Sequence, residues 1–152
     1  MSQELKQEIA TYIQNTRWVQ LATVREDGTP VVRSLGSFAP ASADVVYIAT
    51  NQATEKNKHI AANPRVSLFF QQEGQTPPAF RNVSLVGEAT VATGEERQQA
   101  IALLVARTPF IRAKAEKNEL GDTVVYRVAA KEIKHLDFTR GAGPAAVKVL
   151  KV

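Results

Sequence analysis

The chain has 152 residues, the length of about one domain, and 44% apolar with 22% charged residues is typical of a globular protein. It has no cysteine, which excludes disulfides, thiolate metal sites and cysteine nucleophiles, and two histidines make a multi-histidine metal site unexpected. Much of the net charge of +4 comes from residues 139–152, which carry three basic residues and no acid, so a nucleic-acid surface is not expected.

The sequence also predicts the setting and the domain organisation. The longest wholly apolar run, Ala100–Ala106, is far shorter than a membrane span, and the start lacks the basic and apolar stretches of a secretory signal. A cytoplasmic protein without membrane contact is therefore expected. Residues 1–138 are predicted to form a single domain that begins with a helix, and residues 139–152 are interpreted as a basic tail, solvated or in contact with a partner.

The first half of the chain predicts one helix followed by strands. Ser2 to about Asn15 is expected to be a helix capped by Ser2, with one apolar face formed by Leu5, Ile9, Tyr12 and Ile13. β-Forming residues and a glycine-containing turn then predict a hairpin. The expected order is strand 18–24, turn 25–28, strand 30–38, loop 39–44 and strand 45–50.

The second half predicts further strands with inserted helices. Thr54 is a plausible N-cap for a short helix over 54–62 that Asn63-Pro64 ends. Gly87 is expected to bend or bulge a long strand. A helix with Ile101, Leu104 and Val105 inward is predicted to break at Thr108-Pro109. The remaining expected segments are strand 66–70, loop 71–79, strand 80–91, helix 94–107, helix 110–117 and strands 123–130 and 133–138.

Six or seven strands joined by short connections, with helices inserted rather than alternating, favour a mainly β fold. The tight turn between the first two strands argues against a doubly wound parallel sheet. The sequence therefore predicts a small antiparallel β-barrel with peripheral helices.

Anion-binding groups gather around the second and third predicted strands. Arg33 lies in mid-strand, and residues 50–56 bring the hydroxyls of Thr50 and Thr54, a helix start and Lys56 together. Such groups can hold a phosphate. The same pattern also fits a solvated strand arginine and an ordinary helix cap, so the residues alone leave both interpretations open.

No common nucleotide-binding or hydrolase motif is present. His59 and His135 are interpreted as surface or structural residues, although His59 would matter if the short helix borders a site. Trp18, Phe69 and Phe70 are interpreted as core. No catalytic residue is identified.

The order of segments resembles the flavin-binding split-barrel family named after pyridoxamine 5'-phosphate oxidase. The matching stretches are Gly28–Arg33, Thr50–Pro64, Val66–Phe70 and Arg81–Ala89. The resemblance implies a six- to seven-stranded antiparallel split β-barrel, a homodimer with FMN in clefts between subunits, and a small-molecule redox substrate.

The resemblance also implies roles for individual residues. Arg33, Thr54 and Lys56 would hold the FMN phosphate, and Asn82 would reach the cofactor from the other subunit. The backbone and small residues near the flavin ring and ribityl chain would be Ser34, Leu35, Gly36, Ala49 and Thr50.

Glu55 and Phe38 stand where pyridoxamine phosphate oxidases carry basic residues, and their C-terminal substrate-binding segment is not found. Vitamin B6 oxidase activity is therefore not expected, and FMN-dependent oxidoreduction or flavin binding is the leading hypothesis. A deazaflavin could instead use Arg33, Lys56 and Lys58. A non-enzymatic flavin or haem module is another reading, with His59 or His135 as haem ligands. Single-stranded nucleic-acid binding is disfavoured because aromatics are only 7% of residues.

Overall fold

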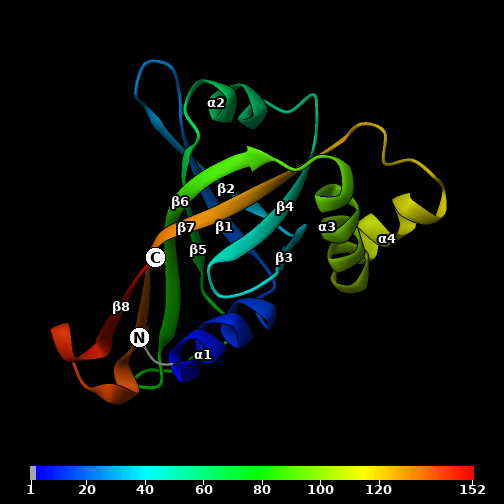
Figure 1. The fold of residues 1–152 in the computed structure, drawn as a ribbon. Helices are drawn as coiled ribbons and strands as arrows, with labels where there is room; N and C mark the ends of the chain where they lie inside the picture. Colours follow the sequence, from blue (N-terminus) through cyan, green and yellow to red (C-terminus); the bar gives the residue numbers. More distant parts are fainter. Residues whose placement is uncertain (1–2) are drawn as a thin grey trace.

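The computed structural model describes residues 3–152, which form one antiparallel sheet wrapped by helices (Figure 1). Ser2, the predicted cap, lies outside the described residues. The helices are α1 (Gln3–Gln14), α2 (Lys56–Ala62), α3 (Gly94–Arg107) and α4 (Pro109–Glu116), with 3-10 turns η1 (Phe138–Arg140) and η2 (Gly143–Ala146). The strands are β1 (Val19–Val24), β2 (Pro30–Leu35), β3 (Phe38–Pro40), β4 (Val45–Asn51), β5 (Arg65–Phe70), β6 (Arg81–Val91), β7 (Thr123–Asp137) and β8 (Val147–Lys151).

The sheet is curled, and its strand order is β2-β1-β5-β6-β7-β4-β3, with β8 added beside β7. All pairings are antiparallel, which confirms the predicted mainly β, antiparallel fold. The β1–β2 hairpin turns through Gly28, whose φ of +87° suits glycine. No described helix is long and apolar enough to cross a membrane.

The core lies on both faces of the sheet. The predicted apolar face of α1 is buried in the larger cluster, and Leu104 of α3 is buried in a smaller one over β4 and β7. Burying these faces is the main stabilising contribution to the fold. Trp18 does not belong to either cluster: its side chain is 42% exposed, so its interpretation as core is wrong.

The predicted strand 30–38 is wrong beyond Leu35. After Leu35 the chain stops pairing with β1 and turns at Gly36 and Ser37. Phe38 is then the first residue of β3 and pairs with Ile48 of β4. Phe38 is fully buried against Phe70, with ring centroids 5.5 Å apart. Burial of this large ring in the other half of the sheet outweighs continuation of the hairpin, and it also converts the start of the expected loop 39–44 into strand.

Thr54 does not cap α2. The helix begins at Lys56, Glu55 occupies the N-cap position, and the Thr54 hydroxyl lies 3.1 Å from the Thr50 hydroxyl instead. The prediction that Thr54 is the N-cap is wrong because its side chain is engaged by the preceding strand. The predicted end of the helix at Asn63 is confirmed.

The bulge predicted at Gly87 is confirmed by a register shift between Val86 and Gly87. A Cβ on Gly87 would collide with the Ala129 carbonyl, so this close strand approach requires glycine. The expected strands 123–130 and 133–138 are one strand, β7, in which Lys131 is the extra, bulged residue opposite Val86 and Gly87. The sequence did not predict β8, which brings Val147–Lys151 into the sheet.

Candidate functional site

The candidate site begins with Arg33 on β2. Its guanidinium Nη1 donates to the Thr23 hydroxyl at 2.7 Å and to the carbonyls of Leu21 and Val31 at 3.3 Å. The register explains the contact, because Thr23 lies opposite Val31, two residues before Arg33 on the same edge strand. The hairpin thus holds the guanidinium across the β1–β2 pair rather than in solvent.

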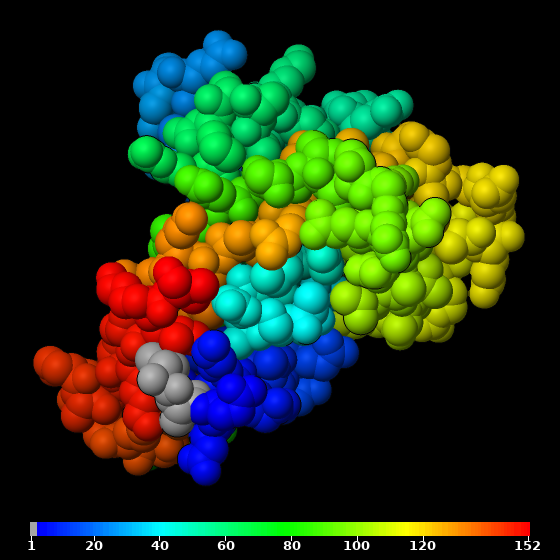
Figure 2. Space-filling model, in the orientation of Figure 1, coloured from blue at the N-terminus to red at the C-terminus, as the bar shows by residue number. Residues whose placement is uncertain are grey.

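Helix α2 adds an imidazole to this arrangement, and Figure 2 shows its residues beside the β1–β2 turn at one end of the molecule. The His59 residue is 5% exposed, and its Nδ1 lies 2.8 Å from the Thr23 hydroxyl and 3.4 Å from Arg33 Nη2. Its Nε2 lies 3.5 Å from a carboxylate oxygen of Glu55. The histidine therefore orients the groups that contact Arg33.

Lys56, in the first turn of α2, completes the arrangement. Its Nζ donates to the Thr50 hydroxyl at 2.8 Å, and Thr50 contacts Thr54. The Asn57 amide donates to Thr54 Oγ1 at 3.0 Å and accepts from Tyr126 at 2.6 Å, which fixes the turn between β4 and the helix. We refer to Thr23, Arg33, Thr50, Lys56 and His59 as the Arg33–Lys56 cluster.

The two cations of this cluster act on each other. Burial lowers the pKa of Lys56, and the neighbouring positive charge of Arg33 lowers it further. Burial also lowers the pKa of Arg33, partly opposed by Glu55. Within residues 3–152 neither cation forms an ion pair with a carboxylate. The negative charge of a bound anion would offset both the repulsion between the cations and the cost of their desolvation.

The predicted residues that follow Arg33 lie along the same edge strand. Ser34 is exposed and donates to Gln20 at 2.8 Å, while Leu35 is half-buried against the larger core cluster. Gly36 follows as the chain turns toward β3, next to the Trp18 ring. Because β2 ends the sheet, half of its backbone N–H and C=O groups have no partner strand and can contact a ligand.

Two predicted residues lie away from the cluster. Ala49 is buried in the smaller core cluster beneath α3, on the opposite side of β4 from Thr50, and only its backbone is close to Ser37. Asn82 lies at the start of β6, opposite Leu136 of β7 and one residue before the part of β6 that pairs with β5. Its implied role belongs to a second subunit and stays a prediction.

Thr23 and His59 are the cluster residues that the sequence analysis did not assign. The signal for Thr23 was available, since a tight turn over 25–28 places it diagonally opposite Arg33. The signal for His59 was weaker: it lies three residues after Lys56, so both share one side of α2. Residues 3–152 hold no group of three or more histidine or acidic side chains able to bind a metal ion.

Comparison with known proteins identifies relatives of the chain. The family model described as pyridoxamine 5'-phosphate oxidase matches residues 5–137. No curated protein matches.

Several solved structures share the fold. A haem-binding protein from Mycobacterium smegmatis is 19% identical with a TM-score of 0.75, the match covering 95% of this chain and 57% of that one. The conserved hypothetical protein Rv2991 from Mycobacterium tuberculosis is 23% identical (TM-score 0.71; 91% and 86% covered). HutZ, a haem storage protein from Vibrio cholerae, is 20% identical (TM-score 0.65; 83% and 89% covered). The chain thus spans little more than half of the first of these proteins, and at such identities the likeness establishes the fold.

Proposed function

We propose that this chain, which belongs to the pyridoxamine 5'-phosphate oxidase family, binds FMN at the Arg33–Lys56 cluster and acts as a flavin-dependent oxidoreductase on a small molecule. The observation that carries the proposal is the meeting of two cations, Arg33 from β2 and Lys56 from α2, neither of which forms an ion pair with a carboxylate within residues 3–152. FMN ends in a phosphate that is close to a dianion at neutral pH, so two cations and a hydroxyl match its charge and its acceptors.

The edge strand supports placement of the rest of the cofactor. From Arg33 the chain runs through Ser34 and Leu35 to Gly36 with an unpaired backbone edge, which offers hydrogen-bond donors and acceptors to the rim of a flavin ring. When bound, the flavin supplies the electron-transfer chemistry. The residues of this chain bind the phosphate, orient the ring and limit the access of water.

We also propose that the protein is a homodimer that covers the β2 edge. Val32 on this edge is 64% exposed, and an exposed edge strand with apolar side chains favours association. Asn82 of a second subunit would then approach the cofactor, as the family resemblance implies. Sedimentation velocity of the full chain and of Val32→Glu tests this point: a dimer that dissociates in the variant supports it, and a monomeric wild type contradicts it.

The experiment that tests FMN binding is an absorbance spectrum of the purified protein, followed by mass analysis of the compound released by heat. Flavin bands and the mass of FMN support the proposal, whereas a deazaflavin mass redirects it to that cofactor. A colourless protein that also fails to bind added FMN contradicts it. Reduction of the bound flavin by NADH, NADPH or a reductase, with reoxidation by an acceptor, distinguishes an enzyme from a flavin carrier.

Haem binding is a second candidate, favoured by the names of two structural neighbours. Both imidazoles are buried, however, with His59 held by Thr23 and His135 lying 3.4 Å from Arg140. Neither ring is free to reach an iron without rearrangement. A Soret band after addition of haem that is lost in His59→Ala or His135→Ala would support this candidate, and the flavin spectrum would exclude it as the resident group.

A further inference from the structure

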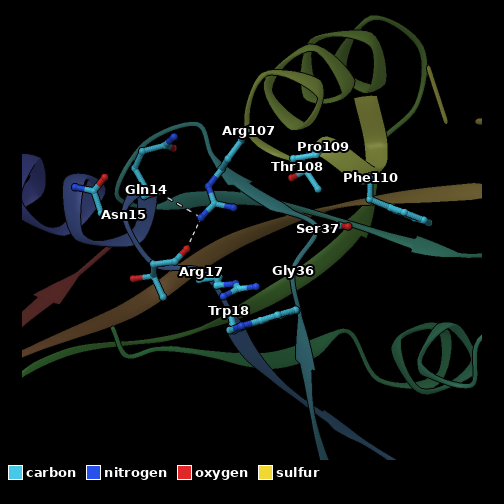
Figure 3. Close-up of a pocket in the computed structure, with 11 residues that line it drawn as sticks. Gln14, Asn15, Arg17, Trp18, Gly36, Ser37, Arg107, Thr108, Pro109 and Phe110 are labelled. Atoms are coloured by element: carbon cyan, nitrogen blue, oxygen red, sulfur yellow. Dashed lines mark hydrogen bonds between the residues drawn. The ribbon is translucent and has the colours of Figure 1, made fainter. Parts of the chain in front are cut away.

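A hollow lies beyond the end of the edge strand, between the end of α1, the Gly36–Ser37 turn and the α3–α4 junction (Figure 3). Its volume is about 580 Å³, within the range of sites for small molecules. In Figure 3, Arg107 and Phe110 enter from the α3–α4 side, and Arg17 and Trp18 from the opposite side. We refer to it as the Arg107 hollow.

The hollow is positively charged and has no acid in its lining. Arg17 and Arg107 both line it, and within the described residues neither pairs with a carboxylate. Burial lowers the pKa of Arg107, whose guanidinium is held by backbone carbonyls and lies 3.9 Å from the centroid of the Phe38 ring. A fixed, desolvated cation of this kind is stabilised by an anion.

Two polar groups in the wall of the hollow lack partners. The Thr108 side chain is only 6% exposed, and its hydroxyl has no hydrogen bond; the same holds for the buried Nε of Arg107. Unsatisfied buried polar atoms are rare in folded proteins and costly. Thr108 also precedes α4, in which Pro109 has no amide N–H and the next amides lack an acceptor within the helix, so donors without partners gather on this side of the hollow.

The hollow also has an aromatic surface. Trp18 is 42% exposed and Phe110 is 66% exposed, although side chains of this size are usually buried. Arg17 lies over the Trp18 ring at 5.3 Å from its centroid. Exposed aromatic faces beside unpaired cations match a ligand that combines a flat ring with a negative charge.

We propose that the Arg107 hollow binds an aromatic carboxylate, with the carboxylate toward Arg107 and Thr108 and the ring against Trp18 and Phe110. Gly36, the last residue of the stretch proposed for the flavin ring, lines the hollow together with Ser37. The further step, that the occupant is the redox substrate, rests on the proposed function. The binding itself does not, because no residue of the Arg33–Lys56 cluster lines the hollow.

Trp18 is the single tryptophan of the chain and reports on the hollow directly. The full chain as purified is titrated with benzoate, with its uncharged analogue benzamide and with the non-aromatic cyclohexanecarboxylate, by Trp18 fluorescence and by calorimetry. We expect saturable benzoate binding and affinities about tenfold weaker for each analogue, since each lacks one of the two matched features. Equal affinity for benzoate and benzamide, or no saturable benzoate signal into the tens of millimolar, overturns the proposal.

Variants locate the binding. Arg107→Lys and Thr108→Val are expected to weaken benzoate about tenfold and severalfold, respectively. Because Arg107 also has a structural role, Arg17→Ala and Phe110→Ala serve as exposed changes that leave the core intact, each with a severalfold loss. Arg65→Ala, an exposed arginine on β5, is the matched control and should bind normally. Unchanged affinity in all four hollow variants contradicts the site, whereas a protein that binds benzoate normally but neither carries FMN nor binds added FMN contradicts only the proposed function.

Discussion

The Arg33–Lys56 cluster and the Arg107 hollow hold their arginines in different ways. Arg33 contacts a hydroxyl and an imidazole as well as strand carbonyls, and a second cation lies close to it. Arg107 is bound by three backbone carbonyls from α1, its following turn and β3, and it stacks on Phe38. In the first arrangement the positive charge is left to be neutralised by a ligand. In the second, the guanidinium joins separate parts of the chain, and a ligand can use only its charge and the N–H groups that are not already hydrogen-bonded.

The largest expected difference concerns stability. Arg107→Met leaves carbonyls of three segments without a donor and is expected to lower the free energy of unfolding by about 2–4 kcal/mol. Arg33→Met removes repulsion as well as hydrogen bonds and is expected to change it by less than about 1 kcal/mol. Urea unfolding of the two matched variants measures both values. Equal losses would contradict the distinction between the two arginines.

The next effect concerns FMN. Replacing Arg33 or Lys56 by alanine removes a charged hydrogen-bond partner of the phosphate, worth ~1.5–3 kcal/mol, and is expected to weaken FMN binding roughly ten- to a hundredfold. Lys58→Ala, an exposed lysine on the same helix, is the control and should bind FMN almost as the wild type does. Fluorescence titration with FMN gives the affinities. Unchanged binding in both cluster variants would rule out this phosphate site.

The pKa of Lys56 predicts a smaller effect that depends on pH. Because burial and Arg33 lower this pKa, Lys56 loses its proton at a lower pH than a free lysine does, and FMN affinity is expected to fall in that alkaline window. Without ligand the sign is opposite: the unfolded chain holds the proton more tightly, so stability attributable to Lys56 rises as the pH passes through the lowered pKa. In Lys56→Arg the charge persists, and FMN titrations across pH should show a flatter alkaline limb than the wild type.

The smallest effect is expected at Gly36, in the hollow. A Cβ at this position would lie 3.0 Å from the Trp18 ring, so Gly36→Ala should shift the ring by a few tenths of an ångström. We expect a change in Trp18 emission with a stability loss of less than about 1 kcal/mol, since the backbone conformation suits alanine. An unchanged emission spectrum would show that the ring is not in contact with Gly36.

Local patterns predicted most of the fold and the centre of the site. The pattern of apolar and β-forming residues predicts α1 and most of the strands. The glycines at positions 28 and 87 predict the turn and the bulge. Arg33 and Lys56 were identified as a possible pair because a charge in mid-strand and a lysine at a helix start are locally unusual. Their proximity depends on α2 packing against β1, which no local pattern contains.

The missed features all depend on contacts between distant segments. Phe38 leaves the hairpin because its ring is buried beside Phe70, and Thr54 gives up its capping role to contact Thr50. Trp18 is exposed although a large aromatic side chain suggests core. β8 forms because the second half of β7 offers it a free edge. Such outcomes follow from tertiary packing, which overrides the local preferences that a single sequence displays.

The single extra residue in β7 has a wider consequence. Tyr126 and Val128 are buried before it, whereas Ile133 and His135 are buried after it, so the parity of inward positions changes at Lys131. In a strand whose side chains alternate between two faces, inserting one residue moves every following side chain to the opposite face. Lys131 thus changes which side chains of Glu132–Asp137 point inward, so the number of residues between the two halves of β7 decides which of them are buried.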